Sequence, residues 1–236
     1  MIDLTPDFVL QVQDEYTGGS ADERGILFHL DGRPAKSPLR KPGSFYVFRE
    51  TDGQVHEVRI TCPYYHPVEI TVDKAALDRE YPVVRVRLHR LDTGVFRDCE
   101  WVRGNYRPGA EVFALAREPS PLLFQSAERG KRNTKLGVQG YTTRRMPGRR
   151  FFLGKEPRGE TVIIDSRDSM GECCTRDRLL EEHQPGEPLQ RAYRSRCDAE
   201  GNYSIPVEPG DEARIDRIAH YDEEKRKWDF VPVPGP

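Results

Sequence analysis

Histidine is the residue type best suited to act as a general base near neutral pH, and this chain has six. They are His29, His56, His66, His89, His183 and His220. None belongs to a catalytic motif, because the sequence has no Gly-x-Ser-x-Gly, P-loop, His-Glu-x-x-His or Gly-x-Gly-x-x-Gly pattern. His29 and His56 lie in alternating segments, and we expect both on solvated strand faces if Leu27 and Val55 face the core. We therefore predict no catalytic residue and expect that the protein is not an enzyme, with an enzyme of unrecognised type as an alternative.

Five cysteines raise the question of a disulfide framework or a zinc centre. They are Cys62, Cys99, Cys173, Cys174 and Cys197. An odd number of cysteines without a secretory leader predicts reduced thiols. The best zinc set would be Cys173, Cys174, His183 and Cys197, but zinc-binding cysteine pairs are usually separated by about two to four residues and Cys173 and Cys174 are adjacent. We expect thiols in strands or the core, with no metal and no other cofactor.

A short acidic run offers oxygen ligands for a cation. Asp165, Asp168 and Glu172 have some of the alternating oxygens of a calcium loop, but their spacing misses the EF-hand pattern and Arg167 adds an opposing charge. A hairpin loop held by local hydrogen bonds is the favoured interpretation.

Charge segregation is the most unusual feature of the sequence. Residues 129–150 contain eight basic residues and no acidic residue, whereas residues 160–236 carry an excess of acidic residues. We predict that Arg144, Arg145, Arg149 and Arg150 contact an acidic protein surface, which could belong to a second copy of this chain. A solvated loop paired with the acidic C-terminal half is the alternative. Nucleic acid is less favoured, although Tyr141 and Phe151 flank the arginines.

The alternation of polar and apolar residues predicts that the chain folds mainly into β-strands. Nineteen prolines and twenty glycines leave little room for ordinary helices. Strands are predicted at 8–12, 26–30, 45–48, 55–60, 68–72 and 83–88. Six strands at this spacing predict an antiparallel β-sandwich domain in residues 1–91, with helical turns only at 73–80.

Residues 92–106 are expected to connect this domain to a second β-sandwich-like domain, which spans residues 92–236 and carries the long basic loop at 129–150. Its strands are predicted at 112–115, 150–153, 161–164, 203–207, 214–221 and 228–233. Two hairpins are expected, one joining 151–153 to 161–164 and one joining 217–221 to 227–231. The best helix candidate is 176–183, which ends before Pro185-Gly186. The fold class is therefore all-β, with two antiparallel sandwich domains and minor helix.

The overall charge and hydropathy limit the possible partners and cellular locations of the protein. The chain has 236 residues, 37 basic and 39 acidic, and a formal net charge of -2, which argues against a general nucleic-acid binder. No apolar run is long enough to span a membrane, and the first residues lack the basic and apolar regions of a secretory signal. We expect a cytoplasmic protein with no membrane partner.

Turn residues in the second half resemble those of the carboxypeptidase-regulatory-like, or transthyretin-like, β-sandwich family. The pattern consists of Gly-Glu-Pro at 186–188, Asp-Ala-Glu-Gly-Asn-Tyr at 198–203 and Pro-Gly at 209–210, and a looser version runs through residues 8–88. The resemblance implies that Asp198 and Gly201 make a tight turn, that Tyr203 and Ile205 point to the core, and that Gly210 relieves the next turn. It also implies a sandwich that serves, without catalysis, as a spacer, binding module or stabiliser.

These observations favour a structural or adaptor protein that contacts other proteins in a larger assembly, such as a phage-tail-like or contractile particle. This setting rests on analogy. Exposed edge strands could add partner strands. The second interpretation is a module that binds a glycan or small ligand on an aromatic platform, for which Tyr64, Tyr65 and Trp101 are the candidates.

Overall fold

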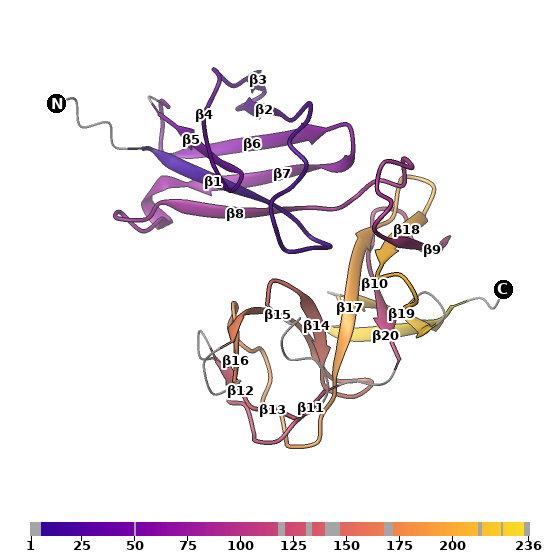
Figure 1. The fold of residues 1–236 in the computed structure, drawn as a ribbon. Coiled ribbons are helices and arrows are strands. Elements are labelled where there is room, and N and C mark those ends of the chain that lie inside the picture. Colours follow the sequence, from indigo (N-terminus) through magenta and orange to yellow (C-terminus); the bar gives the residue numbers. More distant parts are fainter. Residues whose placement is uncertain are drawn as a thin grey trace. The chain divides into compact units, whose positions relative to one another are not determined.

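The computed structural model describes residues 6–49, 51–117, 121–130, 134–139, 147–167, 172–211, 214–222 and 224–233 (Figure 1). The chain divides into two compact units. The first consists of Met1–Glu15 and Gly19–Thr93, and the second of Tyr16–Gly18 and Gly94–Pro236. The main boundary between the units follows Thr93, two residues beyond the boundary after residue 91 that the sequence predicted. The regular secondary structure of the described residues consists of strands and one short 3-10 turn, which confirms the all-β fold class.

The first unit is a sandwich of two four-stranded sheets. One sheet has the order β4 (Leu39–Lys41), β5 (Phe45–Phe48), β1 (Phe8–Asp14) and β8 (Val83–Leu88). The other has the order β3 (Arg33–Pro34), β2 (Leu27–Leu30), β6 (Val55–Cys62) and β7 (Tyr65–Asp73). All six strands predicted for this unit are present. The strand pairs of this unit are antiparallel as predicted, except that β1 and β8 pair in parallel. This pairing is possible because strands of both sheets lie between them in the sequence and supply the long connection that a parallel pair needs.

Val58 and Ile60 determine which face of β6 points inward. Both are buried, and with a period of two they place His56 in the core and leave Val55 on the surface, 55% exposed. In the same way the buried Phe28 turns Leu27 outward, where it is 60% exposed. The expectation for His56 assumed that Leu27 and Val55 face the core, and this assumption was wrong. His56 is a core residue and does not lie on a solvated face.

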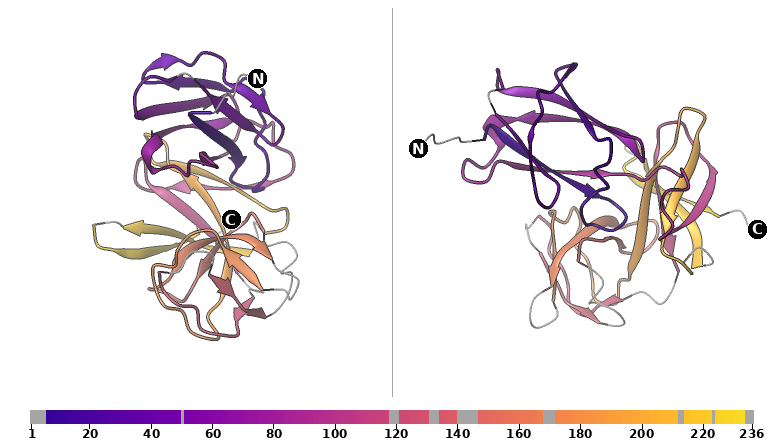
Figure 2. Two further views of the ribbon diagram at one scale, coloured as in Figure 1. Left: turned by 90° about the vertical axis from the view of Figure 1, so that its left-hand side faces the viewer. Right: turned by 45° about the horizontal axis from the view of Figure 1, so that its top comes forward.

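The second unit is organised around one eight-stranded sheet (Figure 2). Its order is β12 (Lys135–Leu136), β16 (Cys173–Thr175), β15 (Glu160–Arg167), β14 (Arg150–Leu153), β17 (Leu189–Arg196), β10 (Glu111–Ala116), β19 (Ile215–Asp222) and β20 (Lys227–Pro232). Two short ribbons accompany it, β18 (Asn202–Val207) with β9 (Glu100–Asn105), and β11 (Leu122–Leu123) with β13 (Val138–Gln139). Both predicted hairpins are present as β14–β15 and β19–β20, the latter a long ribbon drawn in yellow.

The large sheet buries apolar side chains on both faces. Along β10, Val112 and Ala114 belong to a cluster shared with β18, whereas Phe113 and Leu115 belong to a separate cluster around Trp228. Successive side chains of a strand point to opposite faces, so these clusters lie on opposite faces of the sheet. A third cluster contains residues of β11, β12, β14, β15 and β16.

Three sequence expectations about local structure differ from the structure, wholly or in part. Residues 176–183 form no helix, because the Glu160 carboxylate accepts hydrogen bonds from the backbone N–H groups of Leu180 and Glu181 and holds this segment irregular. Helical turns at 73–80 are reduced to a three-residue 3-10 turn, η1 (Lys74–Ala76). Residues 92–106 include the strand β9, which pairs with β18.

The turn that leads into β18 has the geometry expected from its residues. The Asp198 Oδ1 atom accepts hydrogen bonds from the backbone N–H groups of Glu200 and Asn202 at 3.0 and 2.8 Å. Gly201 has a φ of 87°, and a Cβ there would lie 2.3 Å from the carbonyl oxygen of Tyr106. The turn therefore requires glycine, and it delivers Tyr203 into the core.

Candidate functional site

The predicted basic contact is only partly within the described residues. Arg144 and Arg145 lie outside them. Arg149 forms an ion pair with Glu208, and Arg150 is buried, with its Nη1 atom 3.4 Å from the hydroxyl of Thr161. Arg149 and Arg150 are therefore engaged by groups of their own unit.

The residues considered for metal binding are separated by the fold. Cys173 is buried in the cluster of β11, β14 and β15, whereas Cys197 is buried in the cluster of β10 and β18, where burial raises the pKa of its thiol to about 11. Asp165 pairs with Arg176, and Glu172 pairs with Lys135, while Asp168 lies outside the described residues. Across the described ranges, no three His, Cys, Asp or Glu side chains are grouped to hold a metal ion.

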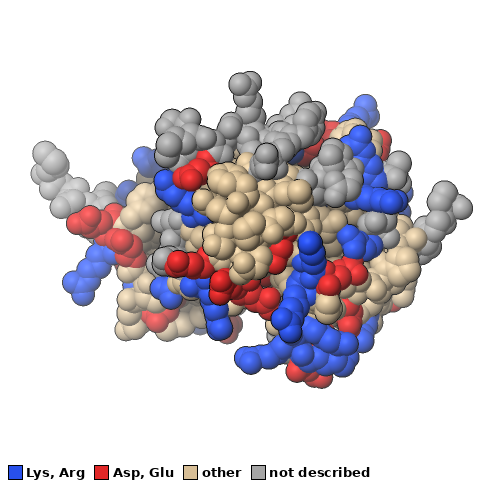
Figure 3. Space-filling view, turned by 90° about the horizontal axis from the view of Figure 1, so that it is seen from below, with Lys and Arg blue, Asp and Glu red and all other residues tan. Residues whose placement is uncertain are grey.

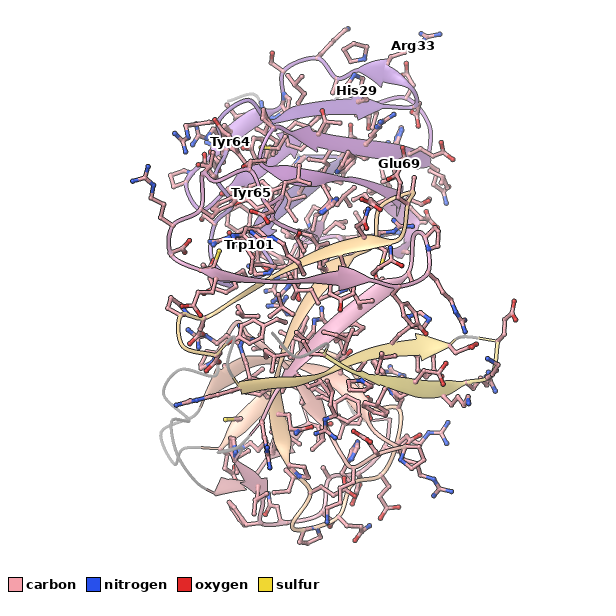
Figure 4. All side chains as sticks on the ribbon, turned by 90° about the vertical axis from the view of Figure 1, so that its right-hand side faces the viewer. His29, Arg33, Tyr64, Tyr65, Glu69 and Trp101 are labelled. Atoms are coloured by element: carbon pink, nitrogen blue, oxygen red, sulfur yellow. The ribbon has the colours of Figure 1, made fainter. Side chains whose placement is uncertain are left out.

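The expected aromatic platform is not assembled in the first unit. Tyr65 is 1% exposed, and its hydroxyl donates to the Asp14 carboxylate at 3.1 Å. The neighbouring Tyr64 lies under the Arg24 guanidinium, 5.2 Å from the ring centroid to the Arg24 Cζ atom. Trp101 belongs to β9 of the second unit (Figure 4). Tyr65 thus stabilises the core and offers no face for stacking.

A pocket of about 610 Å³ lies on the first unit, over β2, β6 and β7. Outward side chains line it, including His29 and the ion pair between Arg59 and Glu69, whose charged atoms are 3.6 Å apart (Figure 4 labels His29 and Glu69). Both members of this pair are exposed, and such pairs contribute little to stability. This surface has the character of a solvated sheet face.

The larger recess is a groove of about 1620 Å³ on the second unit. We call it the Trp228 groove. The turn of the β19–β20 hairpin, the β14–β15 loop and the segment Leu180 to Glu182 line it, with Phe113 and Trp228 among its apolar residues. Figure 3 shows a face of the molecule on which acidic and basic side chains gather in neighbouring areas beside an uncharged area.

Aromatic packing at Trp228 builds the apolar part of the groove. The indole N–H donates to the carbonyl oxygen of Gly159 at 2.7 Å, which ties β20 to the β14–β15 loop. The Phe113 and Phe152 rings meet the indole edge-on, with centroids 5.5 and 5.2 Å away. Tyr221 packs against the same indole and remains exposed at the groove. These contacts combine apolar burial with a satisfied indole N–H, and both stabilise the floor of the groove.

A buried charged cluster positions the second wall of the groove. The imidazole of His183 lies between two carboxylates, with Nε2 3.0 Å from Glu160 and Nδ1 2.7 Å from Glu187. Burial of His183 favours the neutral ring, but hydrogen bonds to Glu160 and Glu187 outweigh it and raise the pKa of His183. The same Glu160 carboxylate holds the backbone of Leu180 and Glu181, so this cluster fixes the wall.

The turn of the β19–β20 hairpin forms another part of the groove lining. The Lys225 side chain and backbone both donate to the Asp222 carboxylate, and together they lower its pKa to about 2. Arg107 lies 3.7 Å from the same carboxylate. Asp222 therefore remains ionised and serves to hold the turn.

Sequence reasoning did not single out the groove residues. Trp228 was recognised only as part of a strand, Glu160 was not noted, and 180–182 were assigned to a helix. One usable signal was the pair of hairpins, whose loops both border the groove. The link between Glu160 and Leu180 depends on tertiary contacts and has no local signature.

Comparisons with protein-family models, with curated proteins and with solved structures found no match. No helix in the described part of the chain has the length and apolar character that a membrane-spanning helix requires.

Proposed function

We propose that this protein is a non-catalytic structural or adaptor component that makes protein–protein contacts in a larger assembly, and that the Trp228 groove receives part of a partner protein. The observation that carries the proposal is the groove itself, which joins an apolar floor to walls of both charge signs. The resemblance of the turn residues to the transthyretin-like sandwiches is consistent with such a role.

The dimensions of the groove favour a polypeptide over a small molecule. Small-molecule pockets are usually enclosed and have volumes of about 300–1,000 Å³, whereas this groove has about 1620 Å³. An extended segment with apolar side chains could cover Phe113 and Trp228 while its polar groups meet the charged walls. Leu180, which is 68% exposed beside the groove, would gain most from being covered.

Two carboxylates of the groove, Asp222 and Glu160, are engaged in holding its shape. Asp222 accepts from Lys225, and Glu160 accepts from His183 and from two backbone amides. A general base needs a lone pair directed at a substrate proton. These two carboxylates instead direct their oxygens at donors of the protein.

Selection from a displayed random-peptide library tests the proposal. The full chain is immobilised sparsely and compared with Leu180→Asp, which puts a charge on the groove wall. Leu27→Asp is the matched control, because Leu27 is similarly exposed but lies in the first unit. We expect wild type and Leu27→Asp to enrich the same peptides, which contain an apolar residue near charges, and Leu180→Asp to lose them.

The selected peptides must then bind in solution, measured by fluorescence anisotropy. We expect affinity for Leu180→Asp to fall by about tenfold or more. Equal binding by both variants, or no enrichment over a blank surface, would show that the groove does not dock polypeptides.

A further inference from the structure

Strand β20 is an open edge of the eight-stranded sheet, in which it stands last and pairs only with β19. Figure 2 draws these two strands as the long yellow ribbon. Among the described residues, no hydrogen bond joins a backbone group of β20 to any segment other than β19. Such an edge carries unpaired N–H and C=O groups that can bond to another strand.

The register shows which backbone groups of β20 point away from β19. Successive residues of an antiparallel strand direct their N–H and C=O groups alternately toward and away from the paired strand. Proline has no N–H, and inside sheets it is found chiefly where its nitrogen points away from the ladder. Pro232 ends β20 opposite Arg217, so with a period of two the backbone groups of Phe230 and Trp228 also point outward.

The same strand borders the Trp228 groove. Lys227 and Trp228 line the groove, and no other terminal strand of the described sheets does so. Phe230 lies on the same face as Trp228 and packs against Phe152. A segment placed along this edge would bond to the backbone of β20 and continue the apolar layer. Recognition by strand addition uses these two features, because main-chain bonds give affinity and adjacent side-chain pockets give specificity.

Asp229 determines which strand suits this edge. It lies between the two outward residues, and its surface ion pair with Lys227, at 3.4 Å, contributes little. If two copies of the chain paired antiparallel through both outward residues, their Asp229 side chains would lie directly opposite each other. Like charges in that position are destabilising, whereas opposite charges are favourable. A foreign strand with a basic residue opposite Asp229 therefore fits better than a second copy.

We propose that the segment in the Trp228 groove is an extended strand of a different protein, which pairs with the open edge of β20 and has the pattern apolar–basic–apolar. The basic residue lies opposite Asp229, and the two apolar residues lie opposite Trp228 and Phe230. This inference rests on the proposed function and names the conformation and the side chains of the occupant.

Methylation of peptide nitrogens tests the strand pairing. The probe is the tightest-binding peptide from the library selection, prepared as a series in which one N-methyl group moves along the sequence. Only alternate N–H groups of an added strand bond to β20. Methylation should therefore weaken binding by about tenfold or more at every second residue and much less at the residues between them. Sensitivity without this alternation overturns the inference.

A pair of variants at Phe230 tests the same bond from the side of the protein. Phe230→Ala and Phe230→Pro both remove the ring, but only Phe230→Pro also removes the outward N–H. We expect the selected peptide to bind Phe230→Pro about tenfold more weakly than Phe230→Ala. Circular dichroism checks that both variants are folded. Equal affinities of the two folded variants would contradict the pairing.

The predicted basic residue is tested by repeating the selection with Asp229→Lys. The enriched peptides should change from apolar–basic–apolar to apolar–acidic–apolar. Asp52→Lys is the matched control, since Asp52 is exposed in the first unit and the charge change is the same. This control should select the wild-type pattern. Identical peptides from both variants would refute the contact with Asp229.

Failure of this inference is distinguishable from failure of the proposed function. Peptides that require Leu180 but show no alternating sensitivity to methylation would keep the docking role and remove strand addition. A selection that enriches no peptide would remove both. Sedimentation velocity covers the remaining occupant, because a dimer of the chain that is lost in Phe230→Pro but kept in Phe230→Ala would assign the edge to a second copy and overturn the inference.

Discussion

Gly159 supports the groove floor because no other residue fits its place. Its φ is 146°, and a Cβ there would lie 2.6 Å from both the carbonyl oxygen of Leu153 and the Phe152 ring. A side chain would therefore push Phe152 away from Trp228, which Gly159 also holds through its carbonyl group. Gly159 therefore links the β14–β15 hairpin, in whose loop it lies, to the β19–β20 hairpin, which carries Trp228.

We predict that Gly159→Ala lowers the free energy of unfolding by about 2–3 kcal/mol through overpacking and backbone strain. Gly186→Ala is the matched control, since Gly186 has a φ of 82° but no atom within 4 Å of its Cβ position, so only the cost of the conformation, about 1 kcal/mol, applies. Urea denaturation monitored by tryptophan fluorescence measures both. Equal losses in the two variants would contradict the steric argument.

At the scale of elements, the segment from Leu180 to Glu182 owes its position to a charged cluster. His183 bridges Glu160 and Glu187, and Glu160 in turn binds the backbone of the segment. If His183 lost its proton, the carboxylates of Glu160 and Glu187 would lie beside a neutral ring, without a positive charge to compensate them. The groove wall is therefore linked to the protonation of one histidine.

The raised pKa of His183 predicts how stability depends on pH. A group whose pKa is higher in the folded state contributes stability that is complete below its unfolded pKa, here 6.5, and is lost as pH rises through the folded value. The free energy of unfolding of wild type should thus fall above pH 6.5 relative to His183→Gln. Urea denaturation from pH 5.5 to about pH 9 measures the difference, with His220→Gln as a histidine control outside the cluster. A difference that does not change with pH would contradict the assignment.

At the scale of the whole molecule, the first unit has a core of its own. Phe8 and Leu10 of one sheet and Val58 and Ile60 of the other are all buried, and every strand of both sheets lies within residues 8–88. A chain of this size can bury enough apolar area to fold alone. The unit therefore has the properties of a domain.

We predict that residues 1–93 fold as a separate protein. Thermal unfolding followed by circular dichroism should show one cooperative transition, and the amide proton spectrum should be well dispersed. A collapsed species that binds hydrophobic dye and melts without cooperativity would show that the unit depends on the rest of the chain.

Local patterns were enough to predict six of the eight strands of the first unit and both hairpins of the second, whereas the short strands β3 and β4 were not predicted. Alternation and turn residues are properties of neighbouring positions, and Asp198 with Gly201 shows that the turn chemistry can be read directly. The inward position of His56 could have followed from Val58 and Ile60. Strand β17, by contrast, was not predicted, because Arg191, Arg194 and Arg196 interrupt the apolar pattern of its sequence.

The central place of β17 follows from contacts between distant residues, since Arg194 pairs with Glu111 and Arg191 donates to the carbonyl oxygen of Arg150. The same holds for the groove, where Glu160 meets Leu180 and Trp228 meets Gly159. Periodicity in a sequence reports which face of a strand is apolar, because that is a local property. Which strands adjoin, and which charges remain outward, depends on long-range packing that only the folded chain defines.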